Sequence, residues 1–182
     1  MLYFKRITMV FLLIPVLAFS GCRSIVRINN RTDPKNFDQI VLITGSDTYY
    51  DEISVNVPDE LRKEDYEITR VEIFGDVSAQ SLGATLVVDL YIGLEPGSAN
   101  LDDSSVNEVI ASAVLTPEDR DVEIRSVNSD LIYKALDHET FWMKATIDYQ
   151  VSSLTIIDIK NLYMDIQLER ETGGLFPILY LF

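Results

Sequence analysis

The chain has 182 residues, with 15 Lys or Arg against 29 Asp or Glu, and a formal net charge of −14. This length fits one domain with its own hydrophobic core. The acidic balance argues against nucleic-acid binding, because a phosphate backbone needs a basic footprint. The one cysteine rules out an intrachain disulfide, so side-chain packing must hold the fold together.

The first 22 residues have the order of an export signal. Lys5 and Arg6 form a positive patch, residues 7–19 are almost wholly apolar, and the small pair Ser20-Gly21 precedes Cys22. Positive, apolar and small-residue regions in this order are typical of a signal peptide with its cleavage site. The apolar run is shorter than the roughly 20 residues that span a bilayer as a helix. We therefore expect the rest of the chain to leave the cytoplasm.

The stretch Phe19-Ser20-Gly21-Cys22 resembles the lipobox of bacterial lipoproteins. The resemblance implies that the signal peptide, residues 1–21, is removed between Gly21 and Cys22. It also implies acyl chains, such as palmitate, on the sulfur of Cys22 and usually on its new amino group. The family most often has Leu where this chain has Phe19. The two alternatives are an ordinary secretory cleavage and an uncleaved anchor, and both still place the chain outside the cytoplasm.

Residue 23 is Arg rather than Asp, which resembles the outer-membrane class of Gram-negative lipoproteins. The resemblance implies a lipid-anchored protein of the cell envelope, at the outer membrane if the source is Gram-negative. It leaves open whether the domain faces the periplasm or the cell surface.

Residues 22–37 predict a basic, flexible tether. They show no sustained hydrophobic period, and their four basic residues against one acid give a charge of +3 (4 − 1). Such a segment suits anionic lipid headgroups. Residues 38–182, in contrast, hold 9 basic and 28 acidic residues, a charge of −19 (9 − 28). We expect this acidic part to be the folded domain.

Alternation of apolar and polar residues predicts strands along most of the domain. In residues 84–94 every second side chain is apolar, and residues 106–115 predict a strand with Val109, Ala111, Ala113 and Leu115 inward, although a helix is an alternative there. Gly75 suggests a bulge. The predicted strands cover residues 40–43, 49–57, 67–77, 84–94, 106–115, 121–127, 141–151 and 154–169, the last of which could be two.

Residues 130–137 predict one short helix, with Ser129 or Asp130 as its cap. Its apolar stripe consists of Leu131, Ile132, Ala135 and Leu136. Seven or eight half-buried strands with short turns predict an all-β, antiparallel β-sandwich. In strand number and spacing alone, the pattern resembles immunoglobulin-like or similar sandwiches.

The residues offer little chemistry for an active site. His138 is the one histidine, and no Gly-x-Ser-x-Gly elbow accompanies it. A metal site needs a second histidine or a thiolate. The carboxylates near Asp102-Asp103 and Glu118-Asp119 lack the spacing of a calcium loop. We therefore expect no enzyme, no catalytic residue, no metal and no cofactor, and keep catalysis by two converging carboxylates as an alternative.

Two apolar features are candidates for interaction. Tyrosines 49, 50, 91, 149 and 163 are expected on the outer faces of the sheets, where they pack across strands or form an aromatic binding surface. Residues 173–182 begin with two glycines and carry no charge. This apolar tail predicts an interaction surface or a strand packed against the domain. Its candidate residues are Leu175, Phe176, Ile178, Leu179, Tyr180 and Phe182.

These observations predict a membrane-anchored envelope lipoprotein that acts as a non-catalytic binding or assembly module. Its expected partners are the membrane, through the lipid on Cys22, and a protein of the envelope. The alternative is a carrier or sensor of an apolar, lipid-like ligand, which would need a cavity large enough for an acyl chain.

Overall fold

The computed structural model describes residues 24–62, 66–99, 101–126 and 129–172. These residues form an all-β sandwich with one short α-helix, which confirms the predicted fold class. In chain order the elements are β1 (Ser24–Arg31), β2 (Ile40–Leu42), β3 (Gly45–Asn56), the 3-10 helix η1 (Asp59–Arg62), β4 (Glu67–Gln80), β5 (Leu86–Gly93), β6 (Asn107–Leu115), β7 (Asp121–Arg125), α2 (Asp130–Leu136), β8 (Thr140–Val151) and β9 (Thr155–Thr172).

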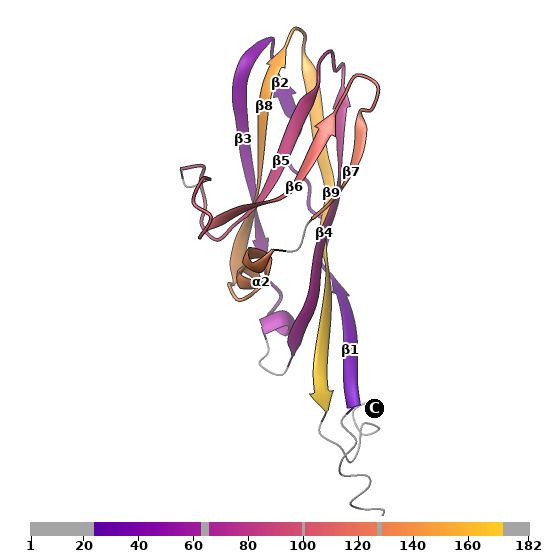
Figure 1. Ribbon diagram of the computed structural model, residues 1–182, viewed down its shortest axis with the longest axis vertical. Helices are drawn as coiled ribbons and strands as arrows, with labels where there is room; N and C mark the ends of the chain where they lie inside the picture. The colour runs from indigo at the N-terminus through magenta and orange to yellow at the C-terminus, as the bar shows by residue number, and fades with distance from the viewer. Residues whose placement is uncertain (1–23, 63–65, 100, 127–128, 173–182) are drawn as a thin grey trace, which may run out of the picture.

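The strands form two antiparallel sheets. Sheet I has the order β1-β9-β4-β7, and β2 pairs with a further stretch of β9. Sheet II has the order β3-β8-β5-β6. Figure 1 shows that β1 and the adjoining ends of β4 and β9 project beyond sheet II. We call this projection, residues 24–31, 67–72 and 165–172, the leg.

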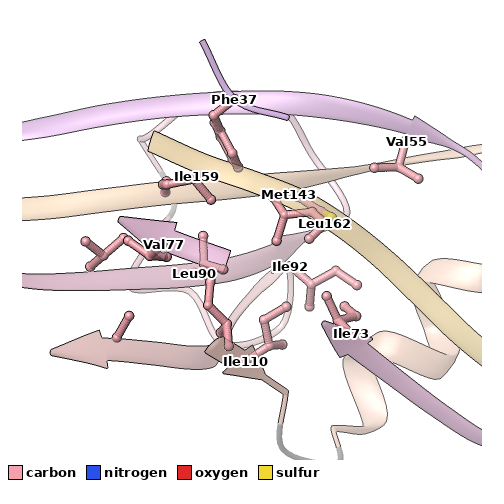
Figure 2. Packing of buried hydrophobic residues seen from close by; sticks show 14 of the residues in the cluster. Phe37, Val55, Ile73, Val77, Leu90, Ile92, Ile110, Met143, Ile159 and Leu162 are labelled. Carbon is pink, nitrogen blue, oxygen red and sulfur yellow. The ribbon is translucent and has the colours of Figure 1, made fainter. Parts of the chain in front are cut away.

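The hydrophobic core lies between the two sheets. Alternate residues of β5 and β8 are buried, because successive side chains of a strand point to opposite faces. Figure 2 shows Leu90, Ile92, Ile110 and Met143 of sheet II beside Ile73, Val77, Ile159 and Leu162 of sheet I, all of them at most 2% exposed. The predicted strand over residues 106–115 is therefore β6, and the helical alternative for it was wrong.

The prediction of a flexible tether was wrong for residues 24–31. This segment is β1, paired with the last eight residues of β9, and Phe37 farther along is buried. The strand was missed because its side chains show no clean alternation: Ile25, Val26 and Ile28 remain 56%, 40% and 38% exposed. Its pairing depends on the long β9 and not on a local signal. Gly21, Cys22 and Arg23 lie outside the described residues.

A bulge in sheet I lies where the sequence predicts one, beside Gly75. The register between β4 and β9 shifts between Phe74 and Asp76, and the extra residue is Asn161 of β9, with a φ of 55°. Asn tolerates this left-handed conformation better than most residues. A Cβ on Gly75 would lie 2.5 Å from Cδ2 of Leu162, so the close approach requires glycine.

A second bulge corrects the predicted faces of β6. The register with β5 shifts between Leu90 and Tyr91, which leaves Ile110 as an extra residue. Ile110 is therefore fully buried, whereas Val109, which we expected to face the core, is 40% exposed. One inserted residue reverses the alternation on one side of it, because the side-chain period of a strand is two.

The predicted helix is α2, and its cap is Ser129. The Ser129 side chain accepts a hydrogen bond from the backbone N–H of Leu131 at 3.0 Å, which satisfies a donor at the helix start. The four predicted apolar residues of the helix are all buried. No helix within the described ranges has both the length and the apolar character to cross a membrane.

Candidate binding site on the outer face of sheet I

Four side chains from four strands stand in a row across the outer face of sheet I. Phe74 of β4 lies between its register partners Tyr163 of β9 and Arg125 of β7. The rings of Phe74 and Tyr163 stack with centroids 5.3 Å apart and an interplanar angle of 21°. The guanidinium carbon of Arg31 lies 4.4 Å from the Tyr163 centroid, and that of Arg125 lies 5.6 Å from the Phe74 centroid. We call this set the arginine–aromatic row.

The row orients its arginines. A cation over an aromatic ring gains about 0.5–1 kcal/mol at an exposed site. The stack also limits the rotamers of side chains that are otherwise long and mobile. Arg31 and Arg125 still have 59% and 60% of their side-chain surface exposed. Their outer N–H groups are therefore held in place and remain accessible to a ligand.

Glu72 connects the row to a third arginine. One carboxylate oxygen of Glu72 accepts from Nη2 of Arg125 at 2.6 Å, and the other accepts from Nη2 of Arg70. These hydrogen bonds, the one from Arg70 first, hold the pKa of Glu72 below its usual value. Asp165 accepts from Nη2 of Arg31 at 3.5 Å. The acids thus hold all three guanidinium groups, and the aromatic rings support those of Arg31 and Arg125 as well.

Beside the row lies a hollow of about 290 Å³, which we call the arginine hollow. Two arginines and two acids balance its charge, although the domain as a whole is strongly acidic. Its lining residues are Asn29, Arg70, Glu72, Phe74, Arg125, Asp165 and Gln167. Guanidinium groups in such a setting bind carboxylate or phosphate oxygens in a bidentate way. The lowered pKa of Glu72 is opposite to the raised pKa that a general acid needs, so the arrangement suits binding better than proton transfer.

Sequence patterns alone do not identify this site, because its four strands are not neighbours along the chain. The order β1-β9-β4-β7 brings residues 31, 74, 125 and 163 together. Of these residues, only Tyr163 is a candidate for a binding surface on the sequence alone. One weak signal is present in the sequence: Arg70 and Glu72 share the polar face of one predicted strand.

The residues singled out in the sequence do not come together. His138 is exposed just after α2. Asp103 accepts from the backbone N–H and the hydroxyl of Ser105, at 2.9 and 2.6 Å, and these bonds lower the pKa of Asp103. Glu108 instead accepts from the Ser129 hydroxyl. In the part of the chain that the structure describes, His, Cys, Asp and Glu form no group of three that could hold a metal ion.

The predicted outer-face position of the tyrosines is wrong for two of them. Tyr49 and Tyr149 pack partly against the core, because Tyr49 pairs with the buried Ile147 on the inner face of sheet II. The hydroxyl of Tyr50 donates to Glu52 at 2.5 Å. The tyrosines therefore do not form one aromatic surface.

Lys144 of β8 is a buried lysine that the sequence alone does not identify. Alternation places it on the outer face of sheet II, yet it is fully buried. Its Nζ donates to the backbone oxygen of Gly97 at 2.9 Å and to Oδ1 of Asn107 at 2.6 Å. A Cβ on Gly93 would lie 2.6 Å from Cε of Lys144. Burial lowers the pKa of Lys144, while the charges of Glu52 and Glu95 act in the opposite direction.

The remaining predicted site residues lie outside the described residues. These are Gly21 and Cys22 of the lipobox and, in the apolar tail, Leu175, Phe176, Ile178, Leu179, Tyr180 and Phe182.

Comparison with known proteins identifies no family. No family model matches the chain, and no curated protein matches it either. A structure of Desmodium yellow mottle tymovirus is similar with a TM-score of 0.33 and 8% identity, over 87% of this chain and 93% of that chain. A structure of Mud crab tombus-like virus has a TM-score of 0.37 and 9% identity, over 88% of this chain and 86% of that chain. A structure of infectious bursal disease virus, Gx strain, has a TM-score of 0.31 and 13% identity, over 85% of this chain and 39% of that chain. At these values the likenesses do not bear on function.

Proposed function

We propose that this chain is a lipid-anchored, non-catalytic binding or assembly module of the cell envelope, and that the arginine hollow holds its protein partner. The observation that carries the proposal is the arginine–aromatic row. Three exposed guanidinium groups, those of Arg31, Arg70 and Arg125, are fixed on one face of an otherwise acidic domain. Arg is enriched among the residues that dominate interface energetics.

The geometry also supports an anchor close to the binding face. β1 begins at Ser24, two residues after the cysteine of the lipobox. Asn29, which lines the hollow, is seven residues from Cys22, so the chain can place the hollow at most about 25 Å from the acylated sulfur. A partner of this face would therefore be a protein that presents acidic groups near the membrane surface.

The alternative role, a carrier of an apolar ligand, receives less support. The buried apolar side chains of both sheets form one continuous cluster in the described part of the chain. Both the arginine hollow and a second one beside β1, of about 280 Å³, are lined largely by polar side chains. Neither has the apolar lining that an acyl chain requires.

The anchor is tested by mass spectrometry of the full chain purified from membranes. We expect a chain that begins at Cys22 and carries acyl groups. An intact Met1 or an unmodified Cys22 thiol would contradict the anchor without bearing on the hollow.

The binding face is tested by photocrosslinking in cells, with a benzophenone side chain at Gln167 in the hollow. We expect a discrete crosslinked product. The R70A/R125A variant should weaken partner binding by about tenfold or more, because truncation of Arg is costly at interfaces, and should remove the product.

The matched control places the same crosslinker at Val114, which is 51% exposed on sheet II. A product of equal yield from Val114, or one that survives R70A/R125A, would show that the hollow is not the binding face.

A further inference from the structure

β3 has one free edge. It is the first strand in the order β3-β8-β5-β6, and no strand in the described part of the chain pairs with its other side. Figure 1 shows β3 at the margin of sheet II, away from the leg. Its 12 residues keep an unbroken register with β8 and include no proline or lysine, two of the residues that usually blunt a free edge. β3 is therefore long and regular enough to accept another strand.

The backbone groups of alternate residues point to this free edge. The N–H of Val57 donates to the carbonyl of Glu139 at 2.9 Å, in the same register as the pairs of β3 and β8. In an antiparallel pair every second residue exchanges hydrogen bonds with the partner strand, so the odd-numbered residues of β3 bond to β8. The N–H and C=O groups of the even-numbered residues, 46 to 56, point away from β8 and toward the free edge.

Two carboxylates lie along the free edge. Oδ1 of Asp47 accepts from the N–H of Thr48, and Oδ1 of Asp51 accepts from the N–H of Glu52, both at 2.8 Å. Because these N–H groups point to the free edge, the carboxylates that cap them lie there too. The two aspartates are four residues apart, a separation of about 13 Å along a strand.

The surroundings of the two carboxylates are acidic. β3 holds three acids and no base. Tyr49 lies between the aspartates, and its hydroxyl donates to Asp51 at 3.4 Å. Burial raises the pKa of Tyr49, and the charges of Asp51 and of Asp38, which precedes β2, raise it further, so a third carboxylate lies close by. Within the described ranges neither Asp47 nor Asp51 pairs with a basic side chain.

We infer that the free edge of β3 docks an extended segment of another protein, which carries two basic side chains four positions apart. This inference goes beyond the proposed function, because it concerns the other sheet and a partner of opposite charge. The segment would pair antiparallel with β3 and exchange backbone hydrogen bonds with its even-numbered residues. The positions opposite Asp47 and Asp51 are then non-hydrogen-bonded pairs, whose Cα atoms lie only about 4.5 Å apart, so both basic side chains reach a carboxylate.

The charge of the edge selects this occupant. Opposite charges directly across two strands stabilise their pairing, and like charges destabilise it. A second copy of β3 would bring acids against acids, so self-pairing is disfavoured. An uncharged strand would gain less, since the carboxylates occupy two of the N–H donors at the edge. Basic side chains draw the carboxylates away and release these donors to the backbone of the docked segment.

The test measures, by fluorescence anisotropy, the binding of a labelled peptide to the full chain purified in mild detergent. The peptide has about ten residues, enough to pair with most of β3. It alternates Thr and Val and carries two lysines four positions apart, on one face. The first control peptide has the same composition but lysines three positions apart, on opposite faces. The second is N-methylated at the backbone nitrogens that would face β3, so it keeps the charge and loses the hydrogen bonds.

We expect the lysine peptide to bind at least about fivefold more tightly than either control peptide. The Asp47→Asn/Asp51→Asn variant keeps both side-chain acceptors but loses their charge, and should weaken binding by about fivefold. The matched control Asp89→Asn removes an acid of β5, two strands away from the edge, and should leave binding unchanged. R70A/R125A should also leave it unchanged, so the edge and the arginine hollow are tested separately.

Hydrogen exchange then locates the bound peptide. We expect slower amide exchange in residues 45–56 and no change in β6, the opposite edge of sheet II. Equal binding of the three peptides, unchanged binding to the Asp47→Asn/Asp51→Asn variant, or protection of β6 in place of β3 would overturn the inference. Absence of binding by the lysine peptide would overturn it as well.

Discussion

Sheet I carries five basic side chains that are between 52% and 67% exposed, namely Arg27, Arg31, Arg70, Arg125 and Lys160. The strands of sheet II, residues 45–56, 86–93, 107–115 and 140–151, hold a single basic residue, Lys144, which is 0% exposed. Each of these five cations pairs with an acid on its own sheet. Lys144 donates instead to a backbone carbonyl and an amide.

The difference separates a proposed binding surface from a structural contact, which we call the clasp: the hydrogen bonds of Lys144 to Gly97 and Asn107. An exposed ion pair contributes little to stability, typically below about 1 kcal/mol, but it holds a guanidinium group in a defined place. A buried lysine loses its hydration and must be compensated by hydrogen bonds, so it fixes whatever supplies them. In sheet II these acceptors are Gly97 and Asn107, which tie the loop between β5 and β6 to the sheet.

The largest effect should come from removing the clasp. Lys144→Met keeps the length of the side chain but leaves the Gly97 carbonyl and the Asn107 amide oxygen without this donor. Asn107 is buried and Gly97 is half-buried, and loss of a hydrogen bond from a charged donor costs about 1–3 kcal/mol, partly offset because the lysine no longer has to be desolvated. We expect a net loss of about 1–3 kcal/mol in the free energy of unfolding, measured with urea, and faster amide exchange in residues 94–106.

Lys134→Met is the matched control, because Lys134 is exposed in the last turn of α2. It should change the free energy of unfolding by less than about 0.5 kcal/mol. If Lys144→Met were equally neutral and left exchange in the loop unchanged, Lys144 would not be a clasp.

A smaller effect is expected at Asn161, where sheet I depends on a left-handed residue. The bulge there changes which residues of β9 face the core, from Ile157 and Ile159 before it to Leu162 and Met164 after it. Asn161→Ala should cost about 1–2 kcal/mol, because Ala disfavours a positive φ, and it also loses the hydrogen bond from Nδ2 of Asn161 to Asp76.

Asn161→Gly separates the two causes, since glycine accepts the positive φ but also lacks the side chain. We expect the glycine variant to be the more stable of the two in thermal or urea unfolding. Equal losses would mean that the bond to Asp76, and not the backbone, determines the cost.

Local patterns were enough to predict the sandwich. Alternation located the strands of both sheets other than β1, Ser129 and the apolar stripe after it located α2, and Gly75 indicated the bulge. In each case the information lies within about ten residues, the range over which alternation and capping act.

The candidate site could not be predicted, because it depends on how distant segments meet. β1 is a strand only because β9 extends far enough to pair with it. Lys144 looks like any residue on a polar face until the loop around Gly97 covers it. The row needs Arg31, Phe74 and Arg125 from strands whose order in the sheet differs from their order in the chain. The alternation of apolar and polar residues carries no information about any of these three long-range contacts.

The smallest effect should appear in sheet I when its central acid is neutralised by Glu72→Gln. The arginine bonds hold the pKa of Glu72 below 4.5, so the folded state favours the ionised form. This stabilisation is fully present above pH 4.5 and is lost as the pH falls through the lowered pKa. We expect the difference in unfolding free energy between wild type and Glu72→Gln to be at most about 1 kcal/mol at pH 7 and to shrink as the pH falls below 4.5. Glu118→Gln, in the exposed turn before β7, should give no such trend. A difference that stays constant with pH would show that the ionised carboxylate does not hold the arginines in place.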